Sequence, residues 1–586
     1  MRSLRRLSFA ALVAGLGFLV VQTADQSAGA ADPPQKLKQK LKQEAKKKAE
    51  EEARKAEEAK KAEEARATDE ARKKAAEEEK RTAAAKKAAS ASKLDAIAIA
   101  ALIDKHIDAK LAAEKITPSA ECTDAEFLRR AYLDVTGVIP TADQAKAFLD
   151  DKSSGKRAKL IDTLLDDPNY GRKHADIWLG KLFPKDSDNR FVQPGPFHEW
   201  LKGEFNKNTP WDQFVSTLVS ATGTVDEHPE VTFFLANRSI DKLTDATTQH
   251  FLGVRLGCAQ CHNHPFAPTK QAEYWGMAAF FSKVAADRPK NANKGGDNTQ
   301  LGVKEGAGPT RAKDFVPESA KKVSAKFLGG PEPKLDAKAP YRPELAKWMT
   351  APTNPYFARA AVNRTWAMLF GNGIVDPVDD LIDRNKPSHP ELLDDLAKQF
   401  VASGYDQKHL IRAICLSRAY QRSAKPTGSN KGDDQLFSHM AVKQMTAYEL
   451  FDSLTAVLGG DKGGKPDARK GADNPKRGPA TERDRFAAFY TAGAEEVNPT
   501  EFEAGIPQML RIMNSKNGPI TATARQLAGK LPPTEAIEKL YLTALARRPT
   551  ADETKQLTAH LAKNPADGYA DVLWAVVNSS EFSMIR

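Results

Sequence analysis

The sequence predicts a mainly α-helical protein in which two helical domains, residues 94–286 and 341–586, are joined by an irregular linker at 287–340. Apolar residues recur at helical spacing from Leu94 onward, as at Phe127, Ala131 and Val135. Motifs that begin helices are frequent, whereas stretches of alternating β-branched residues, which are typical of strands, are scarce. The best candidate strand is Glu230–Leu235.

The first 31 residues have the composition of a secretory signal peptide. Three arginines stand among the first six residues, the thirteen residues Phe9–Val21 are uncharged and mostly apolar, and Ala28–Ala30 offers small residues for cleavage. The apolar run is shorter than the ~20 residues that span a bilayer, although an uncleaved anchor is the alternative. We expect an exported protein, in the periplasm or at the cell surface, whose mature chain begins near Ala31.

A long charged segment follows at residues 36–89. It holds 19 Lys and Arg against 13 Asp and Glu, with no Gly, Pro or aromatic residue, and these residue types favour a helix. Glu51 precedes Lys55 by four positions, the favourable order for an ion pair. Because only Leu37 and Leu41 are apolar residues larger than Ala, a sustained coiled-coil pattern is absent. We expect a single solvated helix, or a coiled-coil-like segment, that is a spacer, a contact to envelope proteins or polymers, or simply a low-complexity linker.

The location of the charge excludes some classes of protein. The formal net charge of +11 comes mostly from the two N-terminal segments, so the body is nearly neutral and we expect no nucleic-acid partner. No other run of 18 apolar residues exists, which predicts no transmembrane segment in the mature chain. Four cysteines in 586 residues are too few for a disulfide scaffold.

Local motifs place several helix starts and loops within the body. Capping boxes, in which a Ser or Thr precedes a Glu or Gln by three positions, occur at Thr123–Glu126, Thr141–Gln144, Ser388–Glu391 and Thr446–Glu449. The Gly- and Lys-rich stretch Gly459–Gly478 predicts a surface insertion in the second domain.

The chemical motif of the chain is Cys258-Ala-Gln-Cys261-His262. Cys-x-x-Cys-His is the attachment signature of c-type haem, because two thiols three positions apart can meet the two vinyl groups on one porphyrin edge. The histidine that follows then supplies the axial ligand to iron. An exported chain suits this interpretation, since haem is attached outside the cytoplasm.

Other interpretations of the motif are open. Cys258 and Cys261 can form a disulfide that closes a turn, or a redox dithiol, although the usual βαβ context is missing. Alternatively Cys258, Cys261, His262 and His264 can bind zinc or another divalent metal. Two axial ligands lie on opposite faces of the haem, so His264, two residues after His262, cannot be the second one. The candidates for the second axial ligand are His250, Met277 and Met349.

No other catalytic constellation stands out, so we assign no catalytic residue and no reaction. The acidic residues Asp379, Asp380, Asp383, Asp394 and Asp395 lie near helix boundaries, where carboxylates commonly complement the helix dipole. Arg364 has a carboxylate such as Asp379 or Asp380 as its candidate partner. Cys122 and Cys415 either pair or are buried as small apolar residues.

The body resembles the planctomycetal cytochrome-associated domain pair of unknown function, in which a PSCyt2-like region (94–286) precedes a PSD1-like region (341–586). The segments that carry the resemblance in the first region are Phe127–Gly137, Asp166–Gly171, Asn208–Phe214 and Phe251–Phe266. Those in the second region are Phe357–Trp366, Leu369–Gly373, Asn385–Leu393, Leu410–Ile414, Ser417–Ser423 and Asn578–Phe582. The resemblance implies an exported bacterial protein but no known reaction. Relatives often carry a further cytochrome c-like domain, and this chain has the charged segment in its place.

Two classes of function follow from the sequence. The first is an exported haem-binding or electron-transfer protein, with Cys258 and Cys261 as thioether anchors and His262 as the ligand to the haem iron. The second is a non-haem scaffold or binding protein of the cell envelope, with a structural metal or a disulfide at the same residues.

Overall fold

The computed structural model describes most of residues 93–586, and only residues 47, 51, 54 and 55 before them. Within 93–586 it leaves out residues 185–191, 193, 266–268, 288–300, 307–322, 459–480, 491–519, 521–522, 525–530 and 566. The expected signal peptide, nearly all of the charged segment and the Gly459–Gly478 insertion therefore lie outside the described residues.

The chain divides into two units, Met1–Glu79 and Lys80–Arg586. In the first unit, Lys47, Glu51, Arg54 and Lys55 are helical and exposed. Lys55 Nζ lies 2.8 Å from Glu51 Oε1, so the ion pair expected from the spacing is present.

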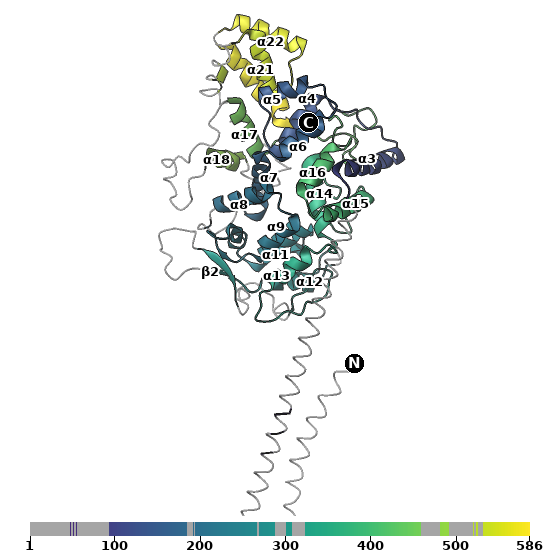
Figure 1. The fold of residues 1–586 in the computed structure, drawn as a ribbon, viewed down its shortest axis with the longest axis vertical. Coiled ribbons are helices and arrows are strands. Elements are labelled where there is room, and N and C mark those ends of the chain that lie inside the picture. The colour runs from purple at the N-terminus through teal and green to yellow at the C-terminus, as the bar shows by residue number, and fades with distance from the viewer. Residues whose placement is uncertain are drawn as a thin grey trace, which may run out of the picture. The chain divides into compact units, whose positions relative to one another are not determined.

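The second unit is mainly helical, as the sequence predicts (Figure 1). Its first half contains α3 (Ala96–Ala113), α4 (Asp124–Thr136), α5 (Ala142–Asp150), α6 (Lys156–Leu165), α7 (Pro168–Leu182), α8 (Gly195–Asn206), α9 (Trp211–Ser220), η1 (Pro229–Val231), α10 (Thr232–Ala236), α11 (Ile240–Leu252), η2 (Gly257–Gln260), α12 (Gln271–Ala278) and η3 (Ala279–Phe281). Its second half contains α13 (Arg342–Met349), α14 (Phe357–Phe370), α15 (Pro390–Ala402), α16 (Gln407–Leu416), α17 (Ala447–Leu458), α18 (Glu482–Tyr490), α21 (Pro533–Leu545), α22 (Ala551–Lys563), α23 (Gly568–Val577) and α24 (Ser580–Ser583). No helix among the described residues is long and apolar enough to cross a membrane.

The predicted helix starts are confirmed at three of the four capping boxes. Thr123 accepts a hydrogen bond from the Glu126 amide at the start of α4, and the reciprocal pair of Thr141 and Gln144 begins α5. Thr446 and Glu449 exchange the same two bonds before α17. At the fourth a helix also starts, since α15 begins at Pro390, but its N-cap is His389 and the expected capping bonds are absent. The Ser388 amide and hydroxyl instead donate to the Ile374 carbonyl.

Short strands form where the sequence analysis expected none. β1 (Gly223–Thr224) and β2 (Val284–Asp287) both pair antiparallel with β3 (Gly302–Glu305), with Ala286 opposite Val303. β3 lies inside the expected linker, so this segment completes a sheet of the first half. The candidate strand Glu230–Leu235 is wrong: it forms η1 and α10, and its side chains are buried on every side, where apolar periodicity cannot distinguish strand from helix.

One hydrophobic core runs through both halves of the second unit, with buried residues from Ala96 in α3 to Leu542 in α21. Helix α4 lies at its centre, and every residue from Phe127 to Thr136 is buried. A second cluster joins Leu133 and Ile139 to the C-terminal helices. Helix α21 packs on α5, as Figure 1 shows near the top of the view.

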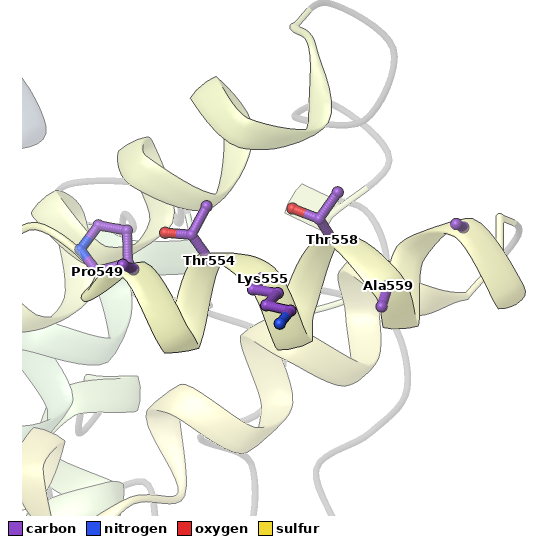
Figure 2. Close-up of a pocket in the computed structure, with 7 residues that line it drawn as sticks. Pro549, Thr554, Lys555, Thr558 and Ala559 are labelled. Carbon is purple, nitrogen blue, oxygen red and sulfur yellow. The ribbon is translucent and has the colours of Figure 1, made fainter.

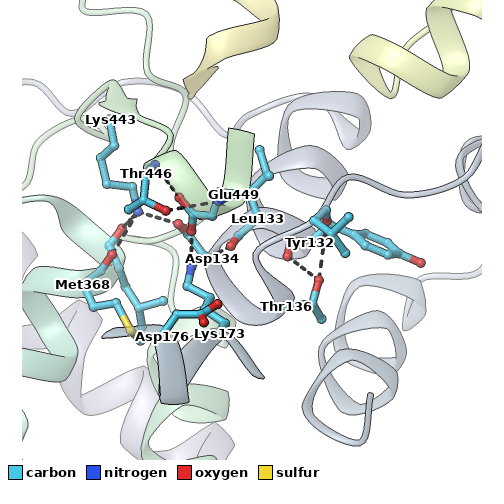
Figure 3. A network of polar contacts seen from close by, with 12 residues as sticks. Tyr132, Leu133, Asp134, Thr136, Lys173, Asp176, Met368, Lys443, Thr446 and Glu449 are labelled. Carbon is cyan, nitrogen blue, oxygen red and sulfur yellow. Dashed lines mark hydrogen bonds and ion pairs between the residues drawn. The ribbon is translucent and has the colours of Figure 1, made fainter. Parts of the chain in front are cut away.

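Buried ion pairs also join the two halves (Figure 3). Lys443 Nζ lies 2.6 Å from Asp134 Oδ1 and also donates to the carbonyl oxygens of Met368 and Leu369. Lys173 Nζ lies 2.8 Å from Glu449 Oε1. All four charged side chains are less than one-tenth exposed, so removal of one partner leaves a buried charge without compensation.

The C-terminus is fixed to α4 by two adjacent arginines. Arg129 donates to the carbonyl oxygens of Ala544 and Phe582, at 2.7 and 2.5 Å. Arg130 donates to the carbonyl oxygens of Tyr420 and Arg586, at 2.6 and 2.7 Å. The last strand, β5 (Met584–Ile585), pairs with β4 (Lys443–Gln444) immediately beside this point. The C-terminal residue is thus held by an arginine of α4 that lies 456 positions earlier in the chain.

Candidate functional site

The Cys-x-x-Cys-His motif forms a short exposed turn between α11 and α12. Gly253 ends α11 with a φ of +66°, a conformation that favours glycine, and the chain then turns into η2. Ala259, between the two cysteines, is fully buried and packs into the core. The turn is therefore anchored at its middle while its flanking residues face outward.

Both thiols of the motif are exposed, and neither is in a disulfide. Cys258 lies in the 3₁₀ turn η2, and Cys261 is the residue directly after it. Side chains three positions apart in a 3₁₀ turn eclipse one another. Cys258 and Cys261 consequently project from the same side of the turn, as attachment to one edge of a planar group requires.

Helix α12 holds the carbonyl groups of the turn. Trp275 Nε1 and Gln271 Nε2 each donate to the Gln260 carbonyl at 3.0 Å, and Gln271 Nε2 also lies 2.9 Å from the Cys261 carbonyl. The Gln271 amide donates to Asn263 Oδ1 at 3.0 Å. These bonds fix the backbone of the motif without using either thiol.

His262 is exposed, and one of its two ring nitrogens has a partner. Nδ1 lies 2.7 Å from the backbone carbonyl oxygen of Asn263, and a carbonyl can only accept, so Nδ1 carries the proton. The lone pair is then on Nε2. A histidine that donates one ring N–H to a carbonyl is in the tautomer that metal ligands adopt.

The four-residue metal alternative is not assembled in this structure. The His264 amide donates to the Thr269 carbonyl at 2.9 Å, and no three His, Cys, Asp or Glu side chains of the described residues are grouped to hold a metal ion. Measurement of the metal content of the purified protein tests the zinc interpretation.

Two residues beneath the turn were not found by the sequence analysis. Asp245 of α11 lies beside Gly257, where a Cβ atom would be 3.4 Å from Oδ2. Burial, with a smaller effect of Asp241, raises the pKa of Asp245 to about 6. Burial and then Asp245 raise the pKa of the neighbouring Tyr274, which is fully buried. The only sequence signal was the position of Asp245 on α11, which does not reveal which helix face meets the turn.

The three candidates for a second axial ligand lie elsewhere in the core. His250 follows Asp245 by five residues, which is about 140° around α11, so it faces a different neighbour. Burial lowers the pKa of His250 to about 4, and its Nδ1 lies 3.9 Å from Asp379 Oδ2 in the second half. Met277 and Met349 are fully buried. All three candidates are thus largely buried side chains, whereas Cys258, Cys261 and His262 are exposed.

The remaining expected residues have structural partners. Arg364 forms the expected ion pair with Asp379 and donates to the His250 carbonyl at 3.1 Å. Burial alone would raise the pKa of Asp379, but Arg364 and His250 hold it well below its usual range. Asp380 accepts from Asn385, Asp394 pairs with Arg359, and Asp395 pairs with His106 and Lys398, while Asp383 is exposed.

The cysteines outside the motif are buried and unpaired. Arg130 Nη1 lies 3.8 Å from Cys122 Sγ, and burial raises the pKa of the Cys122 and Cys415 thiols. Of the aromatic residues that follow the motif, Trp275, Phe280 and Phe281 are buried in the core, and Phe266 lies outside the described residues.

Two cavities of the described structure lie away from the motif. A shallow groove of about 690 Å³ follows the outer face of α22, with Pro549, Thr554, Lys555, Thr558 and Ala559 among its lining residues (Figure 2). A narrower cavity of about 240 Å³ lies between the end of α14 and the loop that leads to β4.

Comparison with known proteins identifies two domains. Residues 102–286 match the PSCyt2 family model, described as a protein of unknown function (DUF1549), and residues 341–561 match the PSD1 family model, a protein of unknown function (DUF1553). The turn at Cys258 lies within the first match. No curated protein and no solved structure matches the chain.

Proposed function

Because this chain belongs to the proteins that join a PSCyt2 domain to a PSD1 domain, and neither domain has an assigned activity, we propose a function from its exposed motif. The protein is an exported envelope protein that carries one covalently attached c-type haem. Cys258 and Cys261 hold the haem through thioether bonds, and His262 is the axial ligand to its iron. When bound, the haem supplies an iron centre that can exchange one electron.

The observation that carries this proposal is the combined state of three exposed side chains. The two thiols are free and share one side of a turn, and His262 directs its only proton-bearing ring nitrogen to a backbone carbonyl. Among the described residues His262 Nε2 has no hydrogen-bond partner, so its lone pair is accessible to a metal ion. The donor set therefore suits a haem of the c type.

The backbone around the motif supports attachment of a rigid group. The bonds from Gln271 and Trp275 and the burial of Ala259 order the turn before any ligand arrives. A preformed site loses less conformational entropy when the ligand binds. Asp245 and Tyr274 add buried polar groups beneath the turn, and polar groups close to the ligands of a metal tune its properties.

The remaining parts of the proposal concern the N-terminal segments. The chain is exported through its signal peptide, and its charged segment is a spacer or a contact to other envelope components. These roles rest on composition, since the segments lie outside the described residues apart from the four helical positions between 47 and 55.

A spectroscopic experiment tests the ligand set. The mature chain is produced together with a haem-maturation system, and its absorption spectrum is recorded before and after denaturation. We expect a haem that stays with the denatured chain, a changed spectrum in His262→Ala, and an unchanged one in His264→Ala. Equal loss of a bound zinc in both variants contradicts haem and supports the metal alternative.

A further inference from the structure

The narrower cavity has a lining that the proposed function does not use. It is bounded by Phe370 at the end of α14, by Asn372 just after it, and by residues 433–442 of the loop before β4. Phe370 and Asn372 belong to Leu369–Gly373, one of the segments that carry the resemblance to the PSD1-like region. The full lining is Phe370, Asn372, Asp433, Asp434, Phe437, His439, Ala441 and Val442.

The apolar part of the lining is built from two packed rings and an exposed aliphatic residue. The ring centroids of Phe370 and Phe437 are 5.2 Å apart, and both residues are nearly buried. Val442 is 54% exposed, and in the described part of the chain Ile97, at 68%, is the only large apolar residue that is more exposed. An alkyl group that enters the cavity would cover it.

The polar part of the lining has unused hydrogen-bond acceptors. Asn372 donates through Nδ2 to the Asp434 carbonyl at 2.8 Å, so its Oδ1 remains available. His439 Nδ1 lies 3.4 Å from the Ser438 hydroxyl, which can donate or accept, so His439 offers either a donor or an acceptor at Nε2. The carboxylate of Asp434 is exposed and has no hydrogen bond within the described part of the chain. Two acceptors, Asn372 Oδ1 and the Asp434 carboxylate, therefore belong to residues that line a cavity of about 240 Å³.

The charge of the lining is negative. It contains two carboxylates and neither Lys nor Arg. Asp433 is a fixed charge: burial would raise its pKa, but hydrogen bonds from the amides of Gln435, Leu436 and Ser438 lower it. The cavity also adjoins the C-terminal end of α14, where the helix dipole favours cations. Lys443 illustrates this preference, since its ammonium group already binds the carbonyl oxygens of Met368 and Leu369 from the core side.

We propose that this cavity binds a primary alkylammonium group. An ammonium group has three N–H donors and no acceptor, which suits a lining with unused acceptors on Asn372 and Asp434 and an excess of negative charge. The alkyl stem packs on Phe370, Phe437 and Val442, and a cation near aromatic rings gains a further attraction. The same chemistry is offered by a free alkylamine and by a lysine side chain of a polypeptide.

Calorimetric titration of the mature chain with n-pentylamine, and with n-pentanol as the uncharged match, tests the proposal. Asp434→Asn should weaken n-pentylamine binding about tenfold and leave n-pentanol binding unchanged, since one charge-assisted contact is lost. Val442→Ser should weaken the binding of both ligands to the same extent. The control Asp552→Asn, an exposed carboxylate in the first turn of α22, should change neither.

The proposal is overturned if n-pentylamine does not bind or if n-pentanol binds as tightly. It is also overturned if Asp434→Asn and Asp552→Asn have the same affinity for n-pentylamine. Nα-acetyl-lysinamide separates the two sources of the ammonium group. Tighter binding of this lysine derivative than of n-pentylamine supports a polypeptide ligand, and binding of n-pentylamine alone supports a free amine. Because neither ligand contacts residues 258–262, failure here leaves the haem proposal intact.

Discussion

The exposed turn at Cys258–His262 and the buried ion pairs around α4 use polar groups in opposite ways. Around α4, the charged atoms of Lys443, Asp134, Lys173 and Glu449 each bind an oppositely charged group, and the ammonium groups also bind backbone carbonyls. In the turn, α12 binds the backbone carbonyls, while Cys258, Cys261 and His262 Nε2 have no hydrogen-bond partner among the described residues. The polar groups around α4 therefore join the two halves, whereas those of the turn are exposed to solvent.

The largest expected effect comes from breaking the buried pairs. Asp134→Asn keeps the size of the side chain but leaves the Lys443 ammonium group without its counter-charge, at a site where Asp134 is 1% exposed. We expect the free energy of unfolding to fall by about 3 kcal/mol or more, as for other buried pairs that lose one partner. Urea denaturation measures it. Asp552→Asn, fully outside the network, should change stability by less than about 0.5 kcal/mol.

The same network predicts that the two halves unfold together. Tryptophans report on both, with Trp178 in the first half and Trp366 in the second. Fluorescence of Trp178→Phe and of Trp366→Phe should give coincident denaturation midpoints after correction for each variant's stability, because one core spans both halves. Two separated transitions would show that the matched domains are independent.

The stability of the core should depend on pH, because its buried histidines must stay neutral. Burial lowers the pKa of His250 to about 4 from an ordinary value of 6.5, so between these values the unfolded chain binds the extra proton. The contribution of His250 to the free energy of unfolding should therefore be fully present above pH 6.5 and be lost as the pH falls toward 4, on the order of 3 kcal/mol in all. His250→Asn should flatten that part of the profile. Burial also lowers the pKa values of His174 and His389, so these residues should account for the rest of the loss of stability between neutral and acid pH.

A smaller effect is expected in the turn itself. Trp275→Phe removes the hydrogen bond from Nε1 to the Gln260 carbonyl and keeps most of the buried ring. Loss of one such bond should cost about 1 kcal/mol of local stability. Amide hydrogen exchange of residues 257–263 should become faster, whereas exchange in α4 should not change. Unchanged exchange in the turn would mean that α12 does not order it.

The smallest effect is expected for the exposed pair of Glu51 and Lys55. Its side chains are 64% and 71% exposed, so water and salt screen the attraction. Such a pair stabilises a helix by about 0.3 to 0.5 kcal/mol. Glu51→Gln should therefore lower the helix content of the isolated charged segment only slightly. Circular dichroism of peptides that span residues 36–89 measures this difference.

The sequence correctly predicted the helical fold class, three capping boxes and the ion pair of Arg364 with Asp379. Each of these depends on periodicity or on residues close in the chain. It did not find β3, which is four residues long and pairs with strands outside the expected linker. It also did not find Asp134 opposite Lys443, 309 positions away, because charge alone does not identify a partner at that separation.

The candidate site shows the same limit. The spacing of Cys258, Cys261 and His262 named the motif, but the tautomer of His262 depends on a backbone carbonyl that only the folded turn brings to Nδ1. Asp245 and Tyr274 were missed because their position beneath the turn depends on how α11 and α12 pack. The cavity beside Phe370 and Asn372 depends in the same way on a distant loop.

The most direct test of the central claim is the intact mass of the denatured, exported chain. We expect the mature protein to be heavier than its sequence by the mass of one haem, and Cys258→Ala combined with Cys261→Ala to abolish that increase. The double variant leaves Ala259 and the bonds from α12 to the turn in place, so the protein should remain folded. A wild-type chain with the bare sequence mass, or one lighter by two hydrogens through a disulfide, would contradict the account.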